Sequence, residues 1–193
     1  MKRKYTWSFE SVVEEYCKGD AENGLNYQYY HRRYLQMYRD QASLHDAIRK
    51  AALSWWLPTT MRHPHQRRIP GSTLRECERR LQRRIKTLSR CTSFSALYLF
   101  VKDRIGDLPH VGALTIYDIT LRIGAYMRLS PEFVYLHSGA LIGARRLGVK
   151  GFVAHRGDFP TAFQRLTPAE IEDCLCVFAD RLEKKDSPAF ISA

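Results

Sequence analysis

The sequence lacks several features that would assign it to a familiar functional class. No apolar run approaches the length that a membrane span requires, and we find no internal repeat, no glycine-rich nucleotide loop and no nucleophile motif. Acidic residues are also scarce, because 20 Asp and Glu stand against 31 Lys and Arg, a net charge of +11. These absences argue against a membrane-spanning protein and a repeat scaffold, and they leave a basic globular chain.

Cysteine is sparse and does not form a set of metal ligands. An odd number of cysteines, five in all, argues against a disulfide framework and favours free thiols in a reducing compartment. Cys174 and Cys176 point to different sides of a predicted helix, and no group of four cysteines suits an iron–sulfur cluster. The basic start at residues 1–4 is followed by glutamates rather than an apolar segment, so we expect no signal peptide. We therefore predict a cytoplasmic protein without a metal or cofactor.

The composition and the apolar spacing predict a helical protein with a sizeable core. Hydrophobic residues make up 45% of the 193 residues and aromatic residues 12%. Helical spacing and N-capping signals recur along the chain, as in Thr167-Pro168-Ala169-Glu170. The predicted helices span 8–18, 25–39, 43–56, 73–89, 93–103 and 140–147, with further helix starts at Ala113, Ser130 and Thr167. We therefore predict an all-α fold of about eight helices over residues 1–193, as one domain or a compact two-lobed one.

The second predicted helix carries an aromatic stripe. Its members at helical spacing are Tyr27, Tyr30, Tyr34, Met37 and Tyr38. Such a stripe can stack on bases, as in proteins that bind single strands. It more often packs into a core with its hydroxyls at the rim, and we predict that role here.

The positive charge is concentrated in one part of the chain. Residues 62–90 hold ten Lys and Arg against two acids, a net of +8, whereas residues 167–186 carry a net of −3. In the helix predicted within the basic stretch, Arg75, Arg79 and Arg83 would lie one turn apart on one flank. A basic balance favours nucleic acid or another anionic surface as the partner, although an arginine-rich helix face is often simply solvated.

The loop before that helix contains the run His63-Pro64-His65-Gln66-Arg67-Arg68. Two histidines can be metal ligands, but no second pair of ligands at suitable spacing accompanies them, so we expect no metal ion. Gln66, Arg67 and Arg68 can donate to phosphates or probe a groove. The alternative is a loop anchored on a neighbouring acid, and the sequence leaves both interpretations open.

The most distinctive stretch covers residues 105–124. One helical pattern stops there, a sharp turn follows through residues 108–112, and a second helix begins at Ala113. Pro109 fixes φ and removes a donor, and Gly112 permits conformations that other residues resist. Two helices joined in this way can be a purely structural hairpin. The turn also exposes unpaired N–H groups at a helix N-terminus, which suits a phosphate.

Two segments resemble parts of the helix-hairpin-helix superfamily, which holds the DNA backbone without reading sequence. Leu108-Pro109-His110-Val111-Gly112 resembles the L-P-G-V-G hairpin of that family, and the helix after it, which ends in Arg122-Ile123-Gly124, is similar as well. His137 to Gly148, HSGALIGARRLG, is similar to the segment that follows the hairpin in the helix-hairpin-helix DNA glycosylases. The resemblance implies a helix-hairpin-helix at about residues 95–126 of this chain.

The resemblance and the basic stretch at 62–90 together indicate a set of DNA-binding residues. These are Pro109, His110, Val111, Gly112, Ala113, Leu114, Gln66, Arg67, Arg68, Arg79 and Arg83. Within the second helix of the hairpin, Asp118 is placed to pair with Arg122 one turn later.

The chain departs from the glycosylase pattern at the positions that carry the chemistry. His110 stands where the family has its first hairpin glycine, and Leu114 stands where the bifunctional enzymes have their Schiff-base lysine. Aligning the second segment places His137 where the essential aspartate should be, whereas counting forward from the hairpin leads to Glu132. Glu132 and His137 are thus the catalytic candidates. Each also has a structural interpretation, Glu132 in the first turn of a predicted helix and His137 as a helix cap.

The function that we expect from the sequence is binding to double-stranded DNA through its phosphate backbone, largely independent of sequence. One alternative is a divergent DNA glycosylase that acts on a modified or damaged base in DNA repair or modification. Another is an interaction module with a protein partner. RNA is not excluded as the nucleic acid, and we expect no membrane partner.

Overall fold

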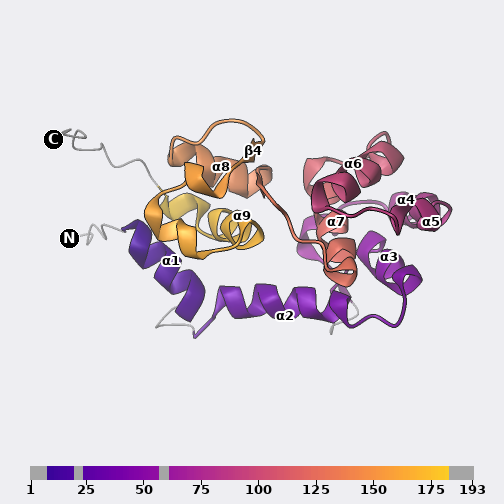
Figure 1. Ribbon diagram of the computed structural model, residues 1–193, viewed down its shortest axis with the longest axis horizontal. Coiled ribbons are helices and arrows are strands. Elements are labelled where there is room, and N and C mark those ends of the chain that lie inside the picture. The colour runs from indigo at the N-terminus through magenta and orange to yellow at the C-terminus, as the bar shows by residue number, and fades with distance from the viewer. Residues whose placement is uncertain (1–7, 20–23, 57–60, 183–193) are drawn as a thin grey trace. The chain divides into compact units, whose positions relative to one another are not determined.

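The computed structural model describes residues 8–19, 24–56 and 61–182, and this part of the chain is mostly helical (Figure 1). The helical fold class is therefore confirmed. The α-helices of the described residues are α1 (Phe9–Lys18), α2 (Tyr27–Arg39), α3 (Leu44–Ala52), α4 (Gly71–Gln82), α5 (Ile85–Leu88), α6 (Phe94–Ile105), α7 (Ala113–Met127), α8 (Ser138–Arg146) and α9 (Pro168–Val177). The start of the chain, in which we looked for a signal peptide, lies outside the described residues.

Short elements connect these helices. Two antiparallel ladders join β1 (Trp55–Trp56) to β2 (Met61–Arg62) and β3 (Val134–Tyr135) to β4 (Val153–Ala154). The 3-10 turns are η1 (Pro64–Gln66), η2 (Arg156–Asp158), η3 (Thr161–Arg165) and η4 (Ala179–Arg181).

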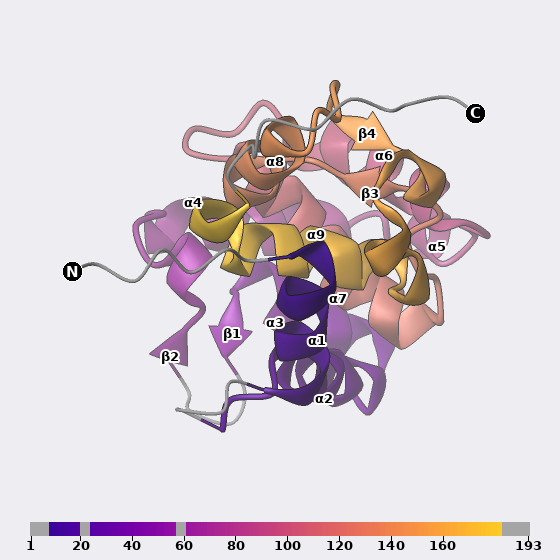
Figure 2. The same cartoon turned by 90° about the vertical axis from the view of Figure 1, so that its left-hand side faces the viewer.

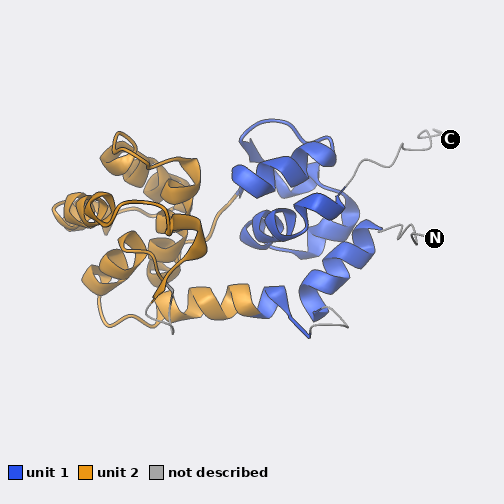
Figure 3. Cartoon of the chain, turned by 180° about the vertical axis from the view of Figure 1, so that it is seen from behind, with its two compact units in different colours: residues 1–29, 133–193 blue, residues 30–132 orange. Residues whose placement is uncertain are grey.

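The chain divides into two compact units (Figure 3). Unit 1 comprises residues 1–29 and 133–193, and unit 2 comprises residues 30–132. The chain passes from one unit to the other within α2 and again after Glu132. The sequence led us to expect one domain over 1–193. A hydrophobic pattern does not reveal which helices share a core, so it could not show where the chain divides.

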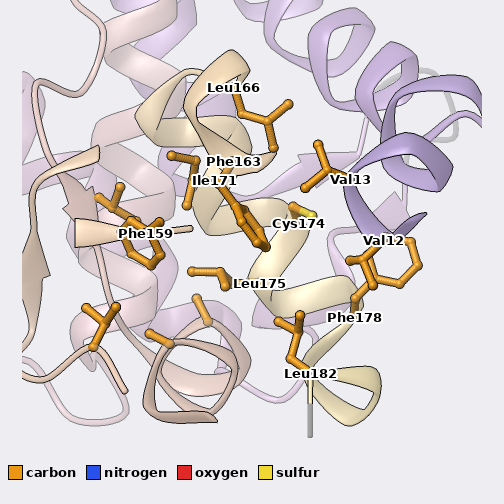
Figure 4. Packing of buried hydrophobic residues seen from close by; sticks show 14 of the residues in the cluster. Val12, Val13, Phe159, Phe163, Leu166, Ile171, Cys174, Leu175, Phe178 and Leu182 are labelled. Atoms are coloured by element: carbon orange, nitrogen blue, oxygen red, sulfur yellow. The ribbon is translucent and has the colours of Figure 1, made fainter. Parts of the chain in front are cut away.

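The core of unit 1 forms around α9 (Figure 4). α8 and β3 pack against α9, and α1 packs against η3. Buried side chains from these elements and their connections meet there, among them Val12, Val13, Phe159, Phe163, Leu166, Ile171, Cys174, Leu175, Phe178 and Leu182. The two ends of the unit's sequence thus share one apolar core.

Two glycines allow α8 to lie close to α9. A Cβ atom at Gly139 would lie 2.8 Å from Cys176 Sγ, and one at Gly143 would lie 2.6 Å from the Leu175 carbonyl oxygen. Gly139 and Gly143 are four residues apart and therefore lie on the same helix face. The backbone approach at Gly143 leaves no room for any side chain.

The helix that we predicted to begin at Ser130 does not form. β3 follows instead, and its buried β-branched and aromatic residues favour a strand. The Glu132 carboxylate, which we expected in the first turn of that helix, accepts hydrogen bonds from the N–H groups of Phe94 and Ser95 at 3.0 and 3.2 Å. The acidic residue therefore caps a helix, but that helix is α6.

Unit 2 is organised around α7, which packs against α3 and α6. α4 also packs against α3 and α6. The buried apolar residues include Tyr38, Ile48, Ala51, Cys77, Leu81, Leu97, Val101, Ile105, Ile116, Ile119 and Ile123. Because α7 has neighbours on several sides, even its polar residues Thr120 and Arg122 are buried.

Two predicted helices of unit 2 are shorter than the sequence indicated. The helix predicted over 43–56 ends at Ala52, because Ser54 adopts a left-handed φ of 57° and β1 then pairs with β2 (Figure 2). The helix predicted over 73–89 begins at Gly71, directly after a proline, and is interrupted between α4 and α5. In both cases a local irregularity ends a pattern that would otherwise continue.

The aromatic stripe of α2 enters the core only toward its C-terminal end. Tyr38 is fully buried, and its hydroxyl donates to the Trp55 carbonyl oxygen at 2.7 Å. Tyr34 is half-buried, whereas Tyr30 is 55% exposed. The prediction of a core role is therefore confirmed for Tyr38 and wrong for Tyr30.

Two features that the sequence lacks are also missing from the described residues. No helix there has both the length and the apolar character that a membrane span requires. Cys77, Cys91 and Cys174 are free thiols, as expected.

The close approach of α8 and α9 gives a stability prediction. We expect Gly143→Ala to destabilise the protein by about 1–3 kcal/mol, because the new methyl group would force the helices apart. Gly157→Ala is the matched control, since Gly157 has open space around it and an ordinary φ. The measurement is urea unfolding followed by circular dichroism. Equal stability of the two variants would contradict the close packing at Gly143.

Candidate nucleic-acid interface

A tight turn joins α6 to α7 in unit 2 (Figure 1). Within it, the Val111 N–H donates to the Leu108 carbonyl oxygen at 3.2 Å. His110 adopts a left-handed φ of 67°, whereas Gly112 is extended with a φ of −108°. The conformational freedom that we expected to matter at Gly112 is therefore not used there, and His110 holds the left-handed position of the turn.

The N-terminus of α7 is open to solvent. Gly112 is the N-cap residue and offers no side chain to the N–H groups of the first turn. The six predicted contact residues are accessible, with Pro109, His110, Gly112 and Ala113 exposed and Val111 and Leu114 half-buried. The positive end of the helix dipole thus faces outward, an arrangement that favours an anion.

The most enclosed charge of unit 2 is Arg122 on α7, which is 1% exposed. Its guanidinium group meets Tyr34 Oη at 2.5 Å, Gln66 Oε1 at 3.0 Å, the Ala51 carbonyl oxygen at 3.2 Å, Ser54 Oγ at 3.3 Å and Asp118 Oδ2 at 3.5 Å. The expected pairing with Asp118 is confirmed. The same group also ties α7 to α2, to the end of α3 and to the loop that contains Gln66.

Both members of the buried pair stay charged. Burial alone would raise the pKa of Asp118, but hydrogen bonds from His65 and Gln66 and the charge of Arg122 outweigh it and hold that pKa well below its ordinary value. Burial alone would lower the pKa of Arg122, and the surrounding Tyr34 and Asp118 oxygens raise it instead. The pair therefore remains ionic at neutral pH.

Gln66 is not available to a nucleic acid. It is fully buried, donates to Asp118 Oδ2 and accepts from Arg122. The prediction that its amide donates to phosphates is therefore wrong, and the alternative of a loop anchored on a neighbouring acid is confirmed for this residue. The next two residues, Arg67 and Arg68, are exposed.

The arginines of the α4 region fall into two groups. Arg79 and Arg80 both pair with Glu76, and their hydrogen bonds lower the pKa of Glu76 to about 2. Arg83 and Arg84 are exposed and make no ion pair within the described residues. Of the two predicted contacts on this helix, Arg83 is better placed than Arg79 to meet a phosphate.

A hollow of about 310 Å³ lies next to the turn. It is lined by Arg80, Arg83, Arg84, Arg104, Asp103 and Asp107. Asp107, in the turn itself, pairs with Arg80 at 2.6 Å, and Arg104 pairs with Asp103 at 3.0 Å. Each of these two ion pairs is neutral in itself. The positive charge of the hollow therefore comes from Arg83 and Arg84.

The net charge belongs entirely to one unit. Unit 2 holds 19 Lys and Arg against 8 Asp and Glu, a net of +11, whereas unit 1 holds 12 of each. The unit that carries the turn is therefore strongly cationic, and the other is neutral.

The fold brings an acid to the two histidines of the loop. His65 Nδ1 lies 3.1 Å from Asp118 Oδ2, although the two residues are 53 positions apart. The backbone N–H of His65 donates to His63 Nδ1 at 3.3 Å. Possible ligand atoms of His63, His65 and Asp118 lie within 4.8 Å of one another. The Arg122 guanidinium, 3.5 Å from the same carboxylate oxygen, opposes a metal cation.

A histidine oriented by a carboxylate, as His65 is by Asp118, is instead the arrangement of an acid–base group. Spacing along the chain gave no sign of it.

The two catalytic candidates lie in different units and have structural contacts. Glu132 is exposed in unit 2, and its carboxylate caps α6. His137 is 7% exposed in unit 1, where it is the N-cap residue of α8 and its Nδ1 lies 3.6 Å from Glu172 Oε1. The capping contacts account for Glu132 without a catalytic role, whereas His137 takes the N-cap position without a side-chain hydrogen bond to the helix.

Comparisons of the chain with models of protein families, with curated proteins and with solved structures give no match. The geometry of the turn, the buried ion pair and the distribution of arginines therefore carry the functional argument.

The buried guanidinium gives a second stability prediction. We expect Arg122→Met to destabilise unit 2 by about 3–5 kcal/mol, because it leaves the Asp118 carboxylate buried without its cation. Arg83→Met removes an exposed arginine and should change stability by no more than about 0.5 kcal/mol. Urea unfolding of both variants measures the difference. Similar stabilities would mean that the Arg122 contacts contribute little.

Proposed function

We propose that unit 2 binds the phosphate backbone of double-stranded DNA, largely without reading its sequence. The observation that carries the proposal is the separation of charge, with the whole net charge of +11 in the unit that contains the α6–α7 turn. A polyanion is the partner that such a surface attracts most strongly. Unit 1 has no net charge with which to contribute to this attraction.

The turn between α6 and α7 supports the proposal. The left-handed backbone at His110 falls where the helix-hairpin-helix pattern has a glycine, the residue that adopts this conformation most easily. The N–H groups from Gly112 to Leu114 lie at an exposed helix N-terminus that no side chain caps, whereas that of Val111 is used within the turn. Donation from these groups to phosphate oxygens would position the duplex without reading its bases.

The exposed arginines supply the charge that the turn itself lacks. Arg83 and Arg84 line the hollow beside the turn, and Arg67 and Arg68 follow the loop that is anchored to α7. If these four residues each neutralise one phosphate, the logarithm of the binding constant should fall with the logarithm of salt concentration with a slope of about −3.6. Such binding depends steeply on salt and little on sequence.

The test is a substitution at the exposed N-cap of α7. Gly112→Glu should weaken duplex binding at least about tenfold, because it places a negative charge where a phosphate would lie. A Cβ atom at Gly112 has open space around it, so the variant should fold normally. The measurement is fluorescence anisotropy of a labelled duplex across a salt series. Gly157→Glu, at an exposed glycine of unit 1, is the matched control.

Three outcomes would contradict the proposal. Equal affinity of the Gly112→Glu and Gly157→Glu variants would remove the turn from the interface. Stronger binding to an RNA duplex than to a DNA duplex would change the partner. No binding at low salt would favour a protein partner instead.

The His65–Asp118 pair favours a second candidate function, hydrolysis of a bond in bound DNA. Asp118 is buried and ionised, and it orients a histidine whose side chain is 39% exposed. Such a histidine can accept a proton from an attacking water. This replaces Glu132 and His137 as the catalytic candidate of a glycosylase-like enzyme.

The second candidate predicts activity that His65→Ala abolishes. The assay follows end-labelled duplexes containing modified or damaged bases, with strand breaks detected directly and after alkaline treatment. Breaks that appear only after alkali would indicate removal of a base, and direct breaks would indicate cleavage of the backbone. Duplex binding without either product would leave unit 2 as a binding module, and activity that survives His65→Ala would exclude this pair.

A further inference from the structure

A second cationic cleft lies in unit 2, at the start of α4. It encloses about 670 Å³, within the usual size range of small-molecule sites. Its walls come from α3, β1, β2 and α4 and include Arg49, Trp55, Arg62, Gly71, Arg75 and Glu78. We propose that this cleft binds a nucleotide, with the phosphate between Arg62 and Arg75 and the base against Trp55.

Two guanidinium groups converge beside Gly71. A Cβ atom there would lie 3.3 Å from Arg75 Nη1 and 3.4 Å from Arg62 Nη2, so the two nitrogen atoms are at most about 6.7 Å apart. That separation allows both groups to donate to the oxygens of one phosphate. A side chain at position 71 would crowd both arginines, whereas glycine leaves the space between them open.

The cations of this cleft are not neutralised by the protein. Arg49, Arg62 and Arg75 form no ion pair within the described residues, and Glu78 is the single acid of the lining. Arg62 is held in place by a hydrogen bond to the Ile69 carbonyl oxygen at 2.7 Å, which leaves the other end of its guanidinium group toward Arg75. Two like charges kept this close repel each other, and an anion between them relieves the repulsion.

Trp55 gives the cleft an aromatic wall. The Arg49 guanidinium lies 5.7 Å from the centre of the indole ring and holds it by a cation–π contact. Aromatic side chains bind bases by stacking, and guanidinium groups bind phosphates in a bidentate manner. A ligand that has both groups, an aromatic base and a phosphate, fits this lining better than inorganic phosphate does.

The cleft is separate from the hollow beside the α6–α7 turn. Arg75 and Arg83 are eight residues apart, which corresponds to about 12 Å along a helix. The cleft therefore does not need the α6–α7 turn, and its ligand is either a free mononucleotide or one nucleotide of a single strand. Both have the same chemistry at the cleft.

The experiment uses the full chain and fluorescently labelled adenosine monophosphate, followed by anisotropy. We expect saturable binding that Arg75→Gln weakens at least about tenfold, because one donor pair to the phosphate is lost. Arg75→Lys keeps the charge but loses the bidentate geometry. Its affinity for the probe should therefore lie between those of the unchanged protein and of Arg75→Gln. Arg90→Gln, at an exposed arginine outside both proposed surfaces, is the matched control and should bind like the unchanged protein. Arg75 is exposed, so circular dichroism should show all three variants folded.

Competition identifies the ligand class and its source. Unlabelled adenosine monophosphate should displace the probe at a concentration at least about tenfold lower than inorganic phosphate, because only the nucleotide contacts Trp55. A short single strand that competes better than the mononucleotide would identify a strand as the source, and one that competes worse would identify the free nucleotide.

Three results would overturn the proposal: no binding of either nucleotide or single strand at millimolar concentration, binding that Arg75→Gln leaves unchanged, or equal competition by phosphate and nucleotide. Gly112→Glu leaves the cleft intact and should still bind the probe. Failure of the backbone interface and failure of the cleft are therefore distinguishable.

Discussion

The arrangement of unit 2 depends on one buried guanidinium group. Removing an arginine from water costs several kcal/mol unless its N–H groups and its charge are compensated. Arg122 meets this condition through acceptors on α2, α3 and α7, at Ser54 directly after α3, and at Gln66 in η1. None of these segments can move away without leaving part of the guanidinium group unsatisfied, so the buried charge fixes their positions together.

This one contact set supports both proposed binding surfaces without lying in either. The hydrogen bond between Gln66 and Asp118 anchors the loop that precedes Arg67 and Arg68 to α7. The N-terminus of the same helix belongs to the α6–α7 turn. Ser54, directly before the strand that carries Trp55, has a left-handed backbone, and its side chain accepts a hydrogen bond from Arg122. A strained backbone position persists only where its surroundings stabilise it, and here backbone hydrogen bonds to Ala51 and His63 act together with the buried arginine.

The sequence predicted what is local and missed what the fold brings together. The helices predicted from residues 8, 43 and 93 begin directly after serine caps, and the capping box at Thr167 begins a helix as predicted, since a cap and its helix are neighbours in the chain. Glu132 instead caps a helix 38 residues away, which no pattern around it could reveal. The division into two units and the cationic clefts depend on such distant contacts as well. The accessible turn at 108–112, by contrast, was readable because proline acts locally, although His110 rather than Gly112 holds its left-handed position.

The arrangement of the arginines separates a binding surface from a merely solvated one. Arginines on a solvated face can move apart, and they pair with acids where acids are near, as Arg79 and Arg80 do with Glu76. Arg62 and Arg75 do neither, because a backbone hydrogen bond holds one of them toward the other. Unrelieved repulsion destabilises a folded protein, so close cations that outnumber the acids beside them are expected where an anion completes the site. The same reasoning applies with less force to Arg83 and Arg84, which are neighbours in the chain and line an open hollow.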